Sequence, residues 1–593
     1  MKTLEGMWLI TGVTALAFVM AAPRAAVAAD RYLDTSASVG LQGSSAPKWT
    51  NTIWSVDIGG TNRTNIASND NVFVQVETGK ALGTLSIPAV PAGTNYYVND
   101  ITVGNGNSVN IGGANFGFNI AGNITVQGGS YLKFNGSGVF ALKPKTTTGL
   151  TIQGGSTNVY DAGASAKGYT MGSLVFGDGD NRLELAAAQT LTFSSISGGS
   201  SNVIALGNAS AKLTINGAGE SSFAGLIQGP GALSKSGSGT LILSGENTFS
   251  NATTLSAGTL VVSNQLALQN STLGGTAGNL QFGAEITDFT LGGLGLAGTL
   301  DVALTNQSGA AVRLKIGQNN ADTTCDGALS ESGGITKIGS GTLTLGTGPH
   351  PYTGDTVVEE GTLAFTAALG PGRIYNGAIS NEGWFVWNTV SAETFNGVIS
   401  GGGTIIKKNT YSLTFNATNT YSGVLIVSNG TLKVANPGSL STNSSLLVAS
   451  GGSVDMNGKT QACVSVGGTG FVTNGTLNVT AALYPGGSNS VGTLTLGNLI
   501  LATGTTVHWD YDGGAGDTNK VLGTATLPAS ATVLVNASET LPSRAVLFDC
   551  DSIEAPGGVG GWTVKGTLPN SFVKVEGSQL LLITIKGTVI SFQ

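Results

Sequence analysis

The chain has 593 residues, of which 10% are charged and 92 are glycine, whereas a typical soluble protein has roughly 25% charged residues and about 7% glycine. The hydrophobic fraction of 40% excludes a disordered tract, because that much apolar surface can offset the loss of chain entropy. The net charge is −7 and basic runs are missing, which argues against nucleic acid and anionic membrane surfaces as partners. Gly, Ser, Thr and Asn replace the Lys and Glu of helical surfaces, so the composition favours strands and turns.

Residues 1–29 have the pattern of a secretory signal peptide. Lys2 provides the positive start, an apolar stretch follows at 7–22, and Ala26-Val27-Ala28 is a small-x-small cleavage site. The 16 apolar residues are fewer than the roughly 20 that a membrane-spanning helix needs. We therefore expect cleavage, export by this signal, and no transmembrane segment in the mature chain.

Residues 30–222 are predicted to form N-terminal β-helical coils with a cap. Within this segment, charged residues alternate along a strand-like stretch, so they could share one face; they are Asp178, Asp180, Arg182 and Glu184. Carboxylates beside a basic group can perform acid–base catalysis on a polysaccharide. The same alternation is typical of a solvated strand face, so these four residues are only an alternative catalytic site.

Residues 223–436 contain one unit of about 38 residues three times, at 223–260, 325–363 and 395–432. The three copies share glycines, one lysine and alternating apolar residues in a fixed order. The shared positions are Gly231, Lys235, Leu241, Leu243 and Gly258 in the first copy, Gly333, Lys337, Leu343, Leu345 and Gly361 in the second, and Gly403, Lys407, Leu413 and Gly430 in the third. A preserved pattern at uneven spacing indicates stacked coils that tolerate insertions.

Alternation with a period of two over four to six residues predicts short strands with one buried face. No long stretch has helical periodicity, and glycine or asparagine would occupy corners that need a positive φ. The predicted fold is all-β, a parallel β-helix (β-solenoid) in which each copy adds roughly two coils of about 20 to 25 residues. The recurring lysines are assigned to outward strand positions, where they would discourage lateral sheet association.

Several single residues can be placed from the repeat and the alternation. Cys325 stands where the other copies have Phe, so we expect an interior position rather than a reactive thiol. His350 falls at an insertion in the second copy and is expected in solvent, whereas His508 falls in a strand-like segment. Trp384 and Trp387 are three residues apart and therefore lie on opposite faces of a strand. No cofactor is expected.

Residues 437–593 are predicted to form further β-helical or β-rich coils. The segment HWDYDGGAGDTNK contains Asp510, Asp512 and Asp517 and resembles the beginning of a calcium-binding loop. The twelfth position of that loop is Val521, where an EF-hand has its closing Glu. A turn between coils is therefore the preferred interpretation, and a metal site at these three aspartates is the alternative.

The repeat resembles the autotransporter-associated β-strand repeat, also called the passenger-associated transport repeat, of Gram-negative surface proteins. The resemblance lies in GALSKSGSGTLILSGENTFS, GGITKIGSGTLTLGTGPHPYTG and GGTIIKKNTYSLTFNATNTYSG, each followed by Gly-Thr-Leu. The third copy departs from the pattern with Asn409 and Tyr411 in place of two glycines. The resemblance implies a right-handed β-helical passenger that is exported and then displayed or released.

Residues 433–593 are too few for the translocator barrel that usually ends such proteins, since twelve strands of roughly ten residues plus connections need more than about 200. We therefore expect export machinery supplied by another protein. The predicted function is a non-enzymatic scaffold or adhesin at the outer cell surface or outside the cell, with surface glycans or a host or neighbouring cell surface as partners. A carbohydrate-active β-helix enzyme (lyase or hydrolase type) and a periplasmic or released spacer are the alternatives.

Overall fold

The computed structural model describes residues 100–585, apart from gaps at 105–107, 115, 121, 138–140, 162–166, 298–299, 488 and 567–570. Before residue 100 it describes only the backbone of β1 (Leu16–Val19), β2 (Tyr32–Leu33), β3 (Trp54–Ser55), β4 (Asp70–Val76), β5 (Leu85–Ser86) and the start of β6 (Thr94–Val103). The predicted signal peptide, residues 1–29, therefore lies outside the described residues, apart from the backbone of β1.

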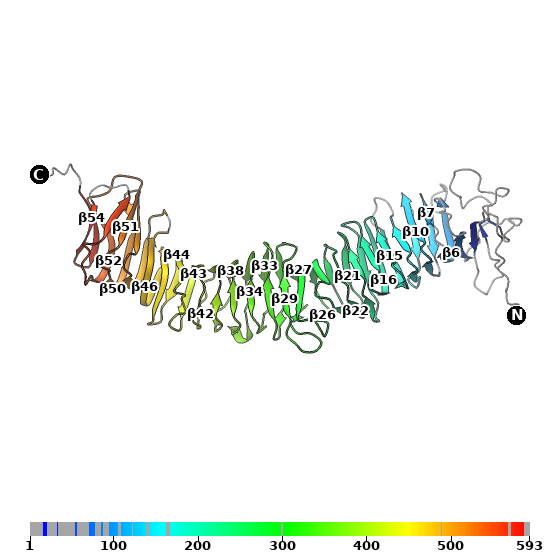
Figure 1. Cartoon of the computed structure of the whole chain (residues 1–593), viewed down its shortest axis with the longest axis horizontal. Helices are drawn as coiled ribbons and strands as arrows, with labels where there is room; N and C mark the ends of the chain where they lie inside the picture. Colours follow the sequence, from blue (N-terminus) through cyan, green and yellow to red (C-terminus); the bar gives the residue numbers. More distant parts are fainter. Residues whose placement is uncertain are drawn as a thin grey trace. The chain divides into compact units, whose positions relative to one another are not determined.

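The chain divides into two compact units, of which unit 1 comprises residues 1–300 and 306–308, and unit 2 comprises residues 301–305 and 309–593. The predicted boundaries at residues 222 and 436 fall within unit 1 and unit 2, respectively. Short strands joined by turns make up both units (Figure 1). Among the described residues, one 3-10 helix (η1, Pro371–Arg373) interrupts the strands, and no helix is long and apolar enough to cross a membrane.

The coils of unit 1 have three sides. The strands β17 (Val203–Leu206), β18 (Lys212–Ile215) and β19 (Ser221–Phe223) form one coil. They pair in parallel with β20 (Leu226–Gln228), β21 (Ala232–Lys235) and β22 (Thr240–Leu243) of the next coil. The preceding coils are built from β7 (Ser108–Ala114), β8 (Phe116–Ile120), β9 (Ile124–Val126), β10 (Tyr131–Ser137), β11 (Ala141–Pro144), β12 (Leu150–Ile152), β13 (Thr157–Tyr160), β14 (Lys167–Phe176), β15 (Arg182–Leu185) and β16 (Gln189–Gly198), and the following coils from β23 (Thr253–Leu255), β24 (Thr259–Val262), β25 (Leu268–Gly275), β26 (Asn279–Phe282) and β27 (Asp288–Leu296).

The coils in the first part of unit 2 also have three sides. Its first side comprises β29 (Arg313–Ile316), β32 (Gly334–Lys337), β34 (Thr356–Val358), β37 (Ile379–Asn381) and β40 (Ile399–Ser400). The second side comprises β30 (Thr323–Cys325), β33 (Thr342–Leu345), β35 (Thr362–Phe365), β38 (Trp384–Trp387) and β41 (Thr404–Lys407). The third side comprises β36 (Ile374–Tyr375), β39 (Glu393–Phe395) and β42 (Leu413–Phe415). A separate pair is formed by β28 (Val302–Ala303) and β31 (Leu329–Ser330).

After residue 424 many of the strands of unit 2 become longer and turn corners. For example, β43 (Val424–Val434) pairs with both β41 and β42. It is followed by β44 (Ser445–Asp455), β45 (Thr460–Gly468), β46 (Phe471–Pro485), β47 (Thr493–Leu501), β48 (Thr506–Asp512), β49 (Ala515–Gly516), β50 (Thr518–Thr526), β51 (Thr532–Ala537), β52 (Arg544–Glu554), β53 (Thr563–Gly566), β54 (Ser571–Glu576) and β55 (Gln579–Thr584). The last strand, β55, pairs antiparallel with β52 and β54.

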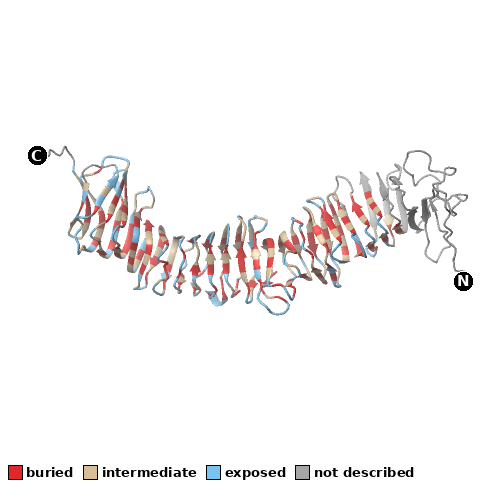
Figure 2. Cartoon of the chain, viewed as in Figure 1, coloured by how far each residue is buried: buried red, intermediate tan, exposed pale blue. Residues whose placement is uncertain are grey.

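The core is a series of apolar ladders that run through successive coils. Leu241 pairs with Leu260 and Leu243 with Val262, and all four side chains are buried. Parallel pairing places equivalent residues roughly 4.8 Å apart, so each coil buries the apolar side chains of the next. Figure 2 shows the resulting alternation of buried and partly exposed residues along the strands. The predicted all-β parallel solenoid is confirmed, as is a spacing of about 20 to 25 residues per coil, shown by the pairs Thr157–Arg182 and Leu233–Thr253; its right-handed sense remains a prediction.

The interior placements made from the sequence are also confirmed. Cys325 is completely buried in β30, and Cys463 and Cys550 are buried and free. Trp387 is buried whereas Trp384 is 49% exposed, so the two indole rings lie on opposite faces of β38. The Trp387 ring packs edge-on against Phe395, with 4.7 Å between ring centroids.

Gly258 provides a direct test of coil stacking. Its φ is +69°, and a Cβ there would lie 2.3 Å from the carbonyl oxygens of Gly237 and Gly239. We predict that Gly258→Ala lowers the free energy of unfolding by about 1–3 kcal/mol, because it combines backbone strain with a clash between coils. Gly219→Ala is the control, since a Cβ at Gly219 meets no atom within 4 Å. Thermal denaturation of both variants checks this, and equal melting temperatures would contradict it.

Candidate functional site

The recurring lysines were predicted to point outward, and this prediction is wrong. Lys235, Lys337 and Lys407 are all buried. Each ammonium group donates to the carbonyl oxygen two residues later in its own turn and to a carbonyl oxygen in the next coil. These acceptor pairs are Gly237 and Ala257 for Lys235, Gly339 and Glu360 for Lys337, and Asn409 and Asn429 for Lys407. All of these acceptors except Asn429, which lies in β43, are turn residues, and the lysine gives their carbonyl oxygens a donor.

Burial without a carboxylate partner disfavours the charged ammonium group. It lowers the pKa of Lys235 and Lys337, and it lowers the pKa of Lys407 to about 8. Lys337 is on the first side of unit 2 and Lys407 on the second, so the repeat is not tied to one side of the coil. The lysines are therefore structural elements of each corner and do not form a ligand ladder on the surface.

The lysine and the following Gly-Thr-Leu belong to the same corner. The next-coil acceptors Ala257, Glu360 and Asn429 each directly precede a glycine with positive φ, and these glycines are Gly258, Gly361 and Gly430. In the third copy Asn409 replaces a glycine, and its side chain compensates. Its Oδ1 accepts from the Lys407 ammonium group at 3.0 Å, and its Nδ2 donates to the Thr389 carbonyl at 2.6 Å.

A buried asparagine bridges three coils in the first and third copies. Asn247 accepts from the Ile227 amide at 2.8 Å and donates to the Ala267 carbonyl at 3.0 Å. Asn419 repeats this arrangement, accepting from Ile399 at 2.8 Å and donating to Ser439 at 2.7 Å.

His350 occupies the corresponding position of the second copy. The backbone amide of Tyr352 donates to the carbonyl oxygen of Leu329, as the amide of Phe249 donates to that of Ile227. His350 and Asn247 each lie two residues before these aromatic residues, so His350 takes the place of Asn247. His350 was predicted to be in solvent, and this is wrong, because it is completely buried. Neither ring nitrogen has a hydrogen-bond partner, and burial lowers its pKa to about 4 despite the opposing charges of Asp326 and Asp301. The register of the repeat therefore sets this side chain inside the coil.

The first candidate site, at residues 178–184, does not lie on a single strand face. Only Arg182 and Glu184 lie in β15, where they pair with each other at 3.0 Å. Asp178 and Asp180 are exposed in the preceding turn. Asp178 borders a shallow hollow with Gln127 and Gln153 of the two preceding coils, whose amides are hydrogen-bonded at 2.9 Å. The two aspartates therefore belong to the turn and the Arg182–Glu184 pair to the strand, so the four residues do not share one strand face.

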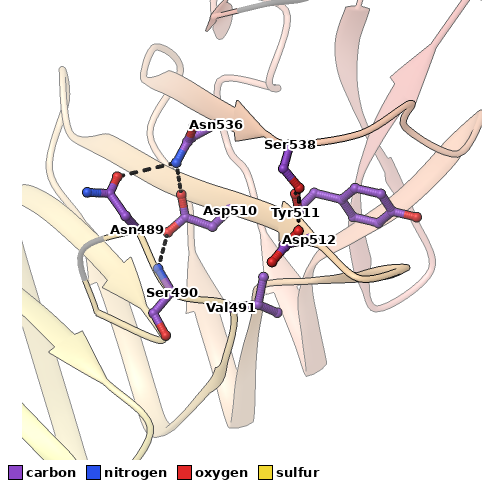
Figure 3. A pocket seen from close by; sticks show the side chains of 8 residues that line it. All are labelled: Asn489, Ser490, Val491, Asp510, Tyr511, Asp512, Asn536 and Ser538. Carbon is purple, nitrogen blue, oxygen red and sulfur yellow. Dashed lines mark hydrogen bonds between the residues drawn. The ribbon is translucent and has the colours of Figure 1, made fainter.

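The second candidate site is a polar hollow of about 330 Å³ on the outward face of β48 and β51, shown in Figure 3. It is lined by Asn489, Ser490, Val491, Asp510, Tyr511, Asp512, Asn536 and Ser538. Asp510 is buried and accepts from the Ser490 amide at 3.0 Å and from Asn536 Nδ2 at 2.8 Å. The Ser538 hydroxyl donates to Asp512. The lining thus comes from three successive segments of unit 2, around residues 490, 511 and 537.

Asp517 does not line this hollow. Its carboxylate is buried and accepts from the backbone amides of Gly492 at 2.7 Å and Asp510 at 2.9 Å. Burial raises its pKa to about 7. Among the described residues, no group of three or more His, Cys, Asp or Glu side chains could hold a metal ion. Asp510 and Asp512 are thus brought together, whereas Asp517 holds the β48–β49 hairpin in place.

The sequence did not indicate Asn489, Ser490, Asn536 or Ser538. They lie 20 or more residues from the aspartates along the chain, and nothing in their local patterns marks them. The sequence carries one signal for the buried lysines, since each lies at the end of a predicted strand and is followed directly by the turn residues of the repeat.

A family model described as Passenger-associated-transport-repeat matches residues 233–262, 335–365 and 405–434. The chain is therefore a parallel β-solenoid that contains three of these repeats, as the resemblance predicted. Among curated proteins it is similar to the Adhesin BmaC autotransporter of Brucella suis biovar 1 (strain 1330), with 36% identity over 146 residues, or 24% of this chain. The match spans 4% of that relative's length.

Among solved structures, this chain is similar to a chain in the crystal structure of the Haemophilus influenzae Hap adhesin. The alignment covers 82% of this chain and 64% of that chain, with 12% sequence identity and a TM-score of 0.27.

Lys407→Met tests the lysine corner. We predict that it lowers the free energy of unfolding by about 1–3 kcal/mol, because carbonyl oxygens of two coils lose their donor. Lys408→Met, which removes a neighbouring exposed lysine, should have little effect. Thermal denaturation combined with hydrogen exchange over residues 405–434 checks this. Equal protection in the two variants would show that the ammonium group does not hold the corner.

His350→Asn should restore the bridge between coils and remove an acid-sensitive group. Because the folded pKa of His350, about 4, lies below the usual value of 6.5, the unfolded chain takes up this proton first as the pH falls. The wild type therefore loses stability between about pH 6.5 and pH 4. We predict a higher melting temperature for His350→Asn, with a difference that grows from pH 7 to pH 5. A constant difference would contradict the role of His350.

Proposed function

We propose that the chain is a passenger-type surface protein of a Gram-negative bacterium that acts as an adhesin or scaffold and not as an enzyme. The observation that carries this proposal is the set of three passenger-associated transport repeats built into a β-solenoid. The similarity to a curated protein that is itself an autotransporter adhesin supports it. The protein acts at the outer cell surface or in the medium, and the export machinery that carries it across the outer membrane is its first partner.

The geometry of the solenoid supports a binding or scaffolding role. Parallel coils present rows of outward side chains at roughly 4.8 Å intervals, which makes a regular, rigid surface. The buried lysines and bridging asparagines of the repeats are engaged in hydrogen bonds that hold corners. For the enzymatic alternative at residues 178–184, two aspartates in a turn and an Arg182–Glu184 pair facing each other give weak support.

Two experiments test this proposal: protease treatment of intact cells tests the location, and deletion of the gene tests the function. We expect external protease to remove this protein from intact cells, or the protein to be found in the medium, and deletion of its gene to reduce attachment of the cells to surfaces. The matched control is a periplasmic marker protein, which must survive the same treatment. Protection in intact cells with release in the periplasmic fraction would contradict surface display and favour the periplasmic spacer.

A further inference from the structure

We propose that the outward face of β48 and β51 is a binding site for an uncharged saccharide unit of a glycan. This proposal rests on the proposed function and names the chemical class that the adhesin would recognise. The site combines the polar hollow at Asp510 and Asp512 with an aromatic and apolar strip beside it. These two surfaces correspond to the hydroxyl-bearing edge and the apolar face of a sugar ring.

The polar part of the site can exchange hydrogen bonds with several hydroxyl groups at once. The side chains of Asp510 and Asp512 each have one or two neutral partners, and a carboxylate has lone pairs for more. Asn489 and Asn536 add amide groups at the exposed rim. Carboxylate and amide groups that converge on one hollow are suited to hydrogen bonding with vicinal hydroxyl groups. The hollow has a volume of about 330 Å³, which is at the lower end of the range for ligand pockets.

The apolar strip is formed by Tyr484, His508 and Leu534. The rings of Tyr484 and His508 stack with 4.0 Å between centroids, and Leu534, which pairs with His508 across the strands, is 37% exposed. His508 and Asp510 are alternate residues of β48, so their side chains emerge on the same face. A sugar that rests its C–H face on this strip therefore has its hydroxyl groups directed at the hollow.

The charge of the site selects among saccharides. Asp510 and Asp512 line it, and their hydrogen-bond partners are neutral. Acidic sugars such as sialic acid or uronates would meet like charge, which is unfavourable at a binding surface. An uncharged glycan meets no such penalty. One site of this size gives weak affinity, so attachment of cells would depend on many copies of the protein acting together.

An array of neutral, sialylated and uronate-containing glycans, probed with the purified full chain, tests the proposal. We expect binding to neutral glycans, weakened about tenfold or more by His508→Ala and by Asp512→Asn. The matched controls are Tyr411→Ala and Asp551→Asn, which remove an exposed aromatic ring and an exposed carboxylate elsewhere. Thermal denaturation confirms that each variant is folded, and Asp512→Asn, at an exposed position, keeps the test valid if His508→Ala does not fold.

Unchanged neutral-glycan binding in both variants, a preference for acidic glycans, or no glycan binding at all would overturn the site. Attachment of cells separates this failure from that of the proposed function. If gene deletion reduces attachment but Asp512→Asn does not, the adhesin role stands and the saccharide site falls. If gene deletion leaves attachment unchanged, the adhesin role itself falls.

Discussion

Parallel stacking of coils is the constraint on which the rest of this structure depends. Each residue has an equivalent residue roughly 4.8 Å above and below it, so a side chain must fit its neighbours in three coils at once. Apolar residues meet this condition by forming ladders such as Leu241–Leu260. Glycine meets it at corners such as Gly258, where the positive φ and the carbonyl oxygens of the preceding coil leave no room for a Cβ. The repeat preserves the residue types that can meet this condition and tolerates variation elsewhere.

Polar groups inside the coils follow the same rule. A buried lysine is costly unless its donors are satisfied, and here the carbonyl oxygens of two consecutive turns satisfy them. The buried asparagines bridge coils in the same way, with one acceptor and one donor contact each. Where the sequence departs from the rule, the structure shows the consequence. Asn409 supplies a replacement contact for its corner, whereas His350 leaves both ring nitrogens without a partner.

The division between interior and surface also explains where recognition can occur. The interior is repetitive because every coil must match the next, and its lysines and bridging asparagines are occupied in holding corners. The outward side chains do not have to fill a shared core, although some of them also match from coil to coil, as the hydrogen-bonded ladder of Asn396, Asn416 and Asn436 shows. The hollow at Asp510 arises where the strands have lengthened and the β48–β49 hairpin departs from the simple corner. A binding site on a solenoid of this kind is therefore assembled from side chains of neighbouring coils and not from one motif.

The sequence by itself determined the all-β parallel solenoid, the coil of about 20 to 25 residues, the repeat, and the interior positions of Cys325 and Trp387, because alternation and internal homology report directly on which side chains face inward. The tertiary structure alone decided the burial of Lys407, because its ammonium group meets the carbonyl oxygen of Asn429 in the next coil. It also decided the burial of His350, because the register of the repeat sets this side chain inside although no group meets its ring nitrogens. It also decided the grouping of Asn489, Asp510 and Asn536. These residues are 21 and 26 positions apart, and only the register between coils brings them together.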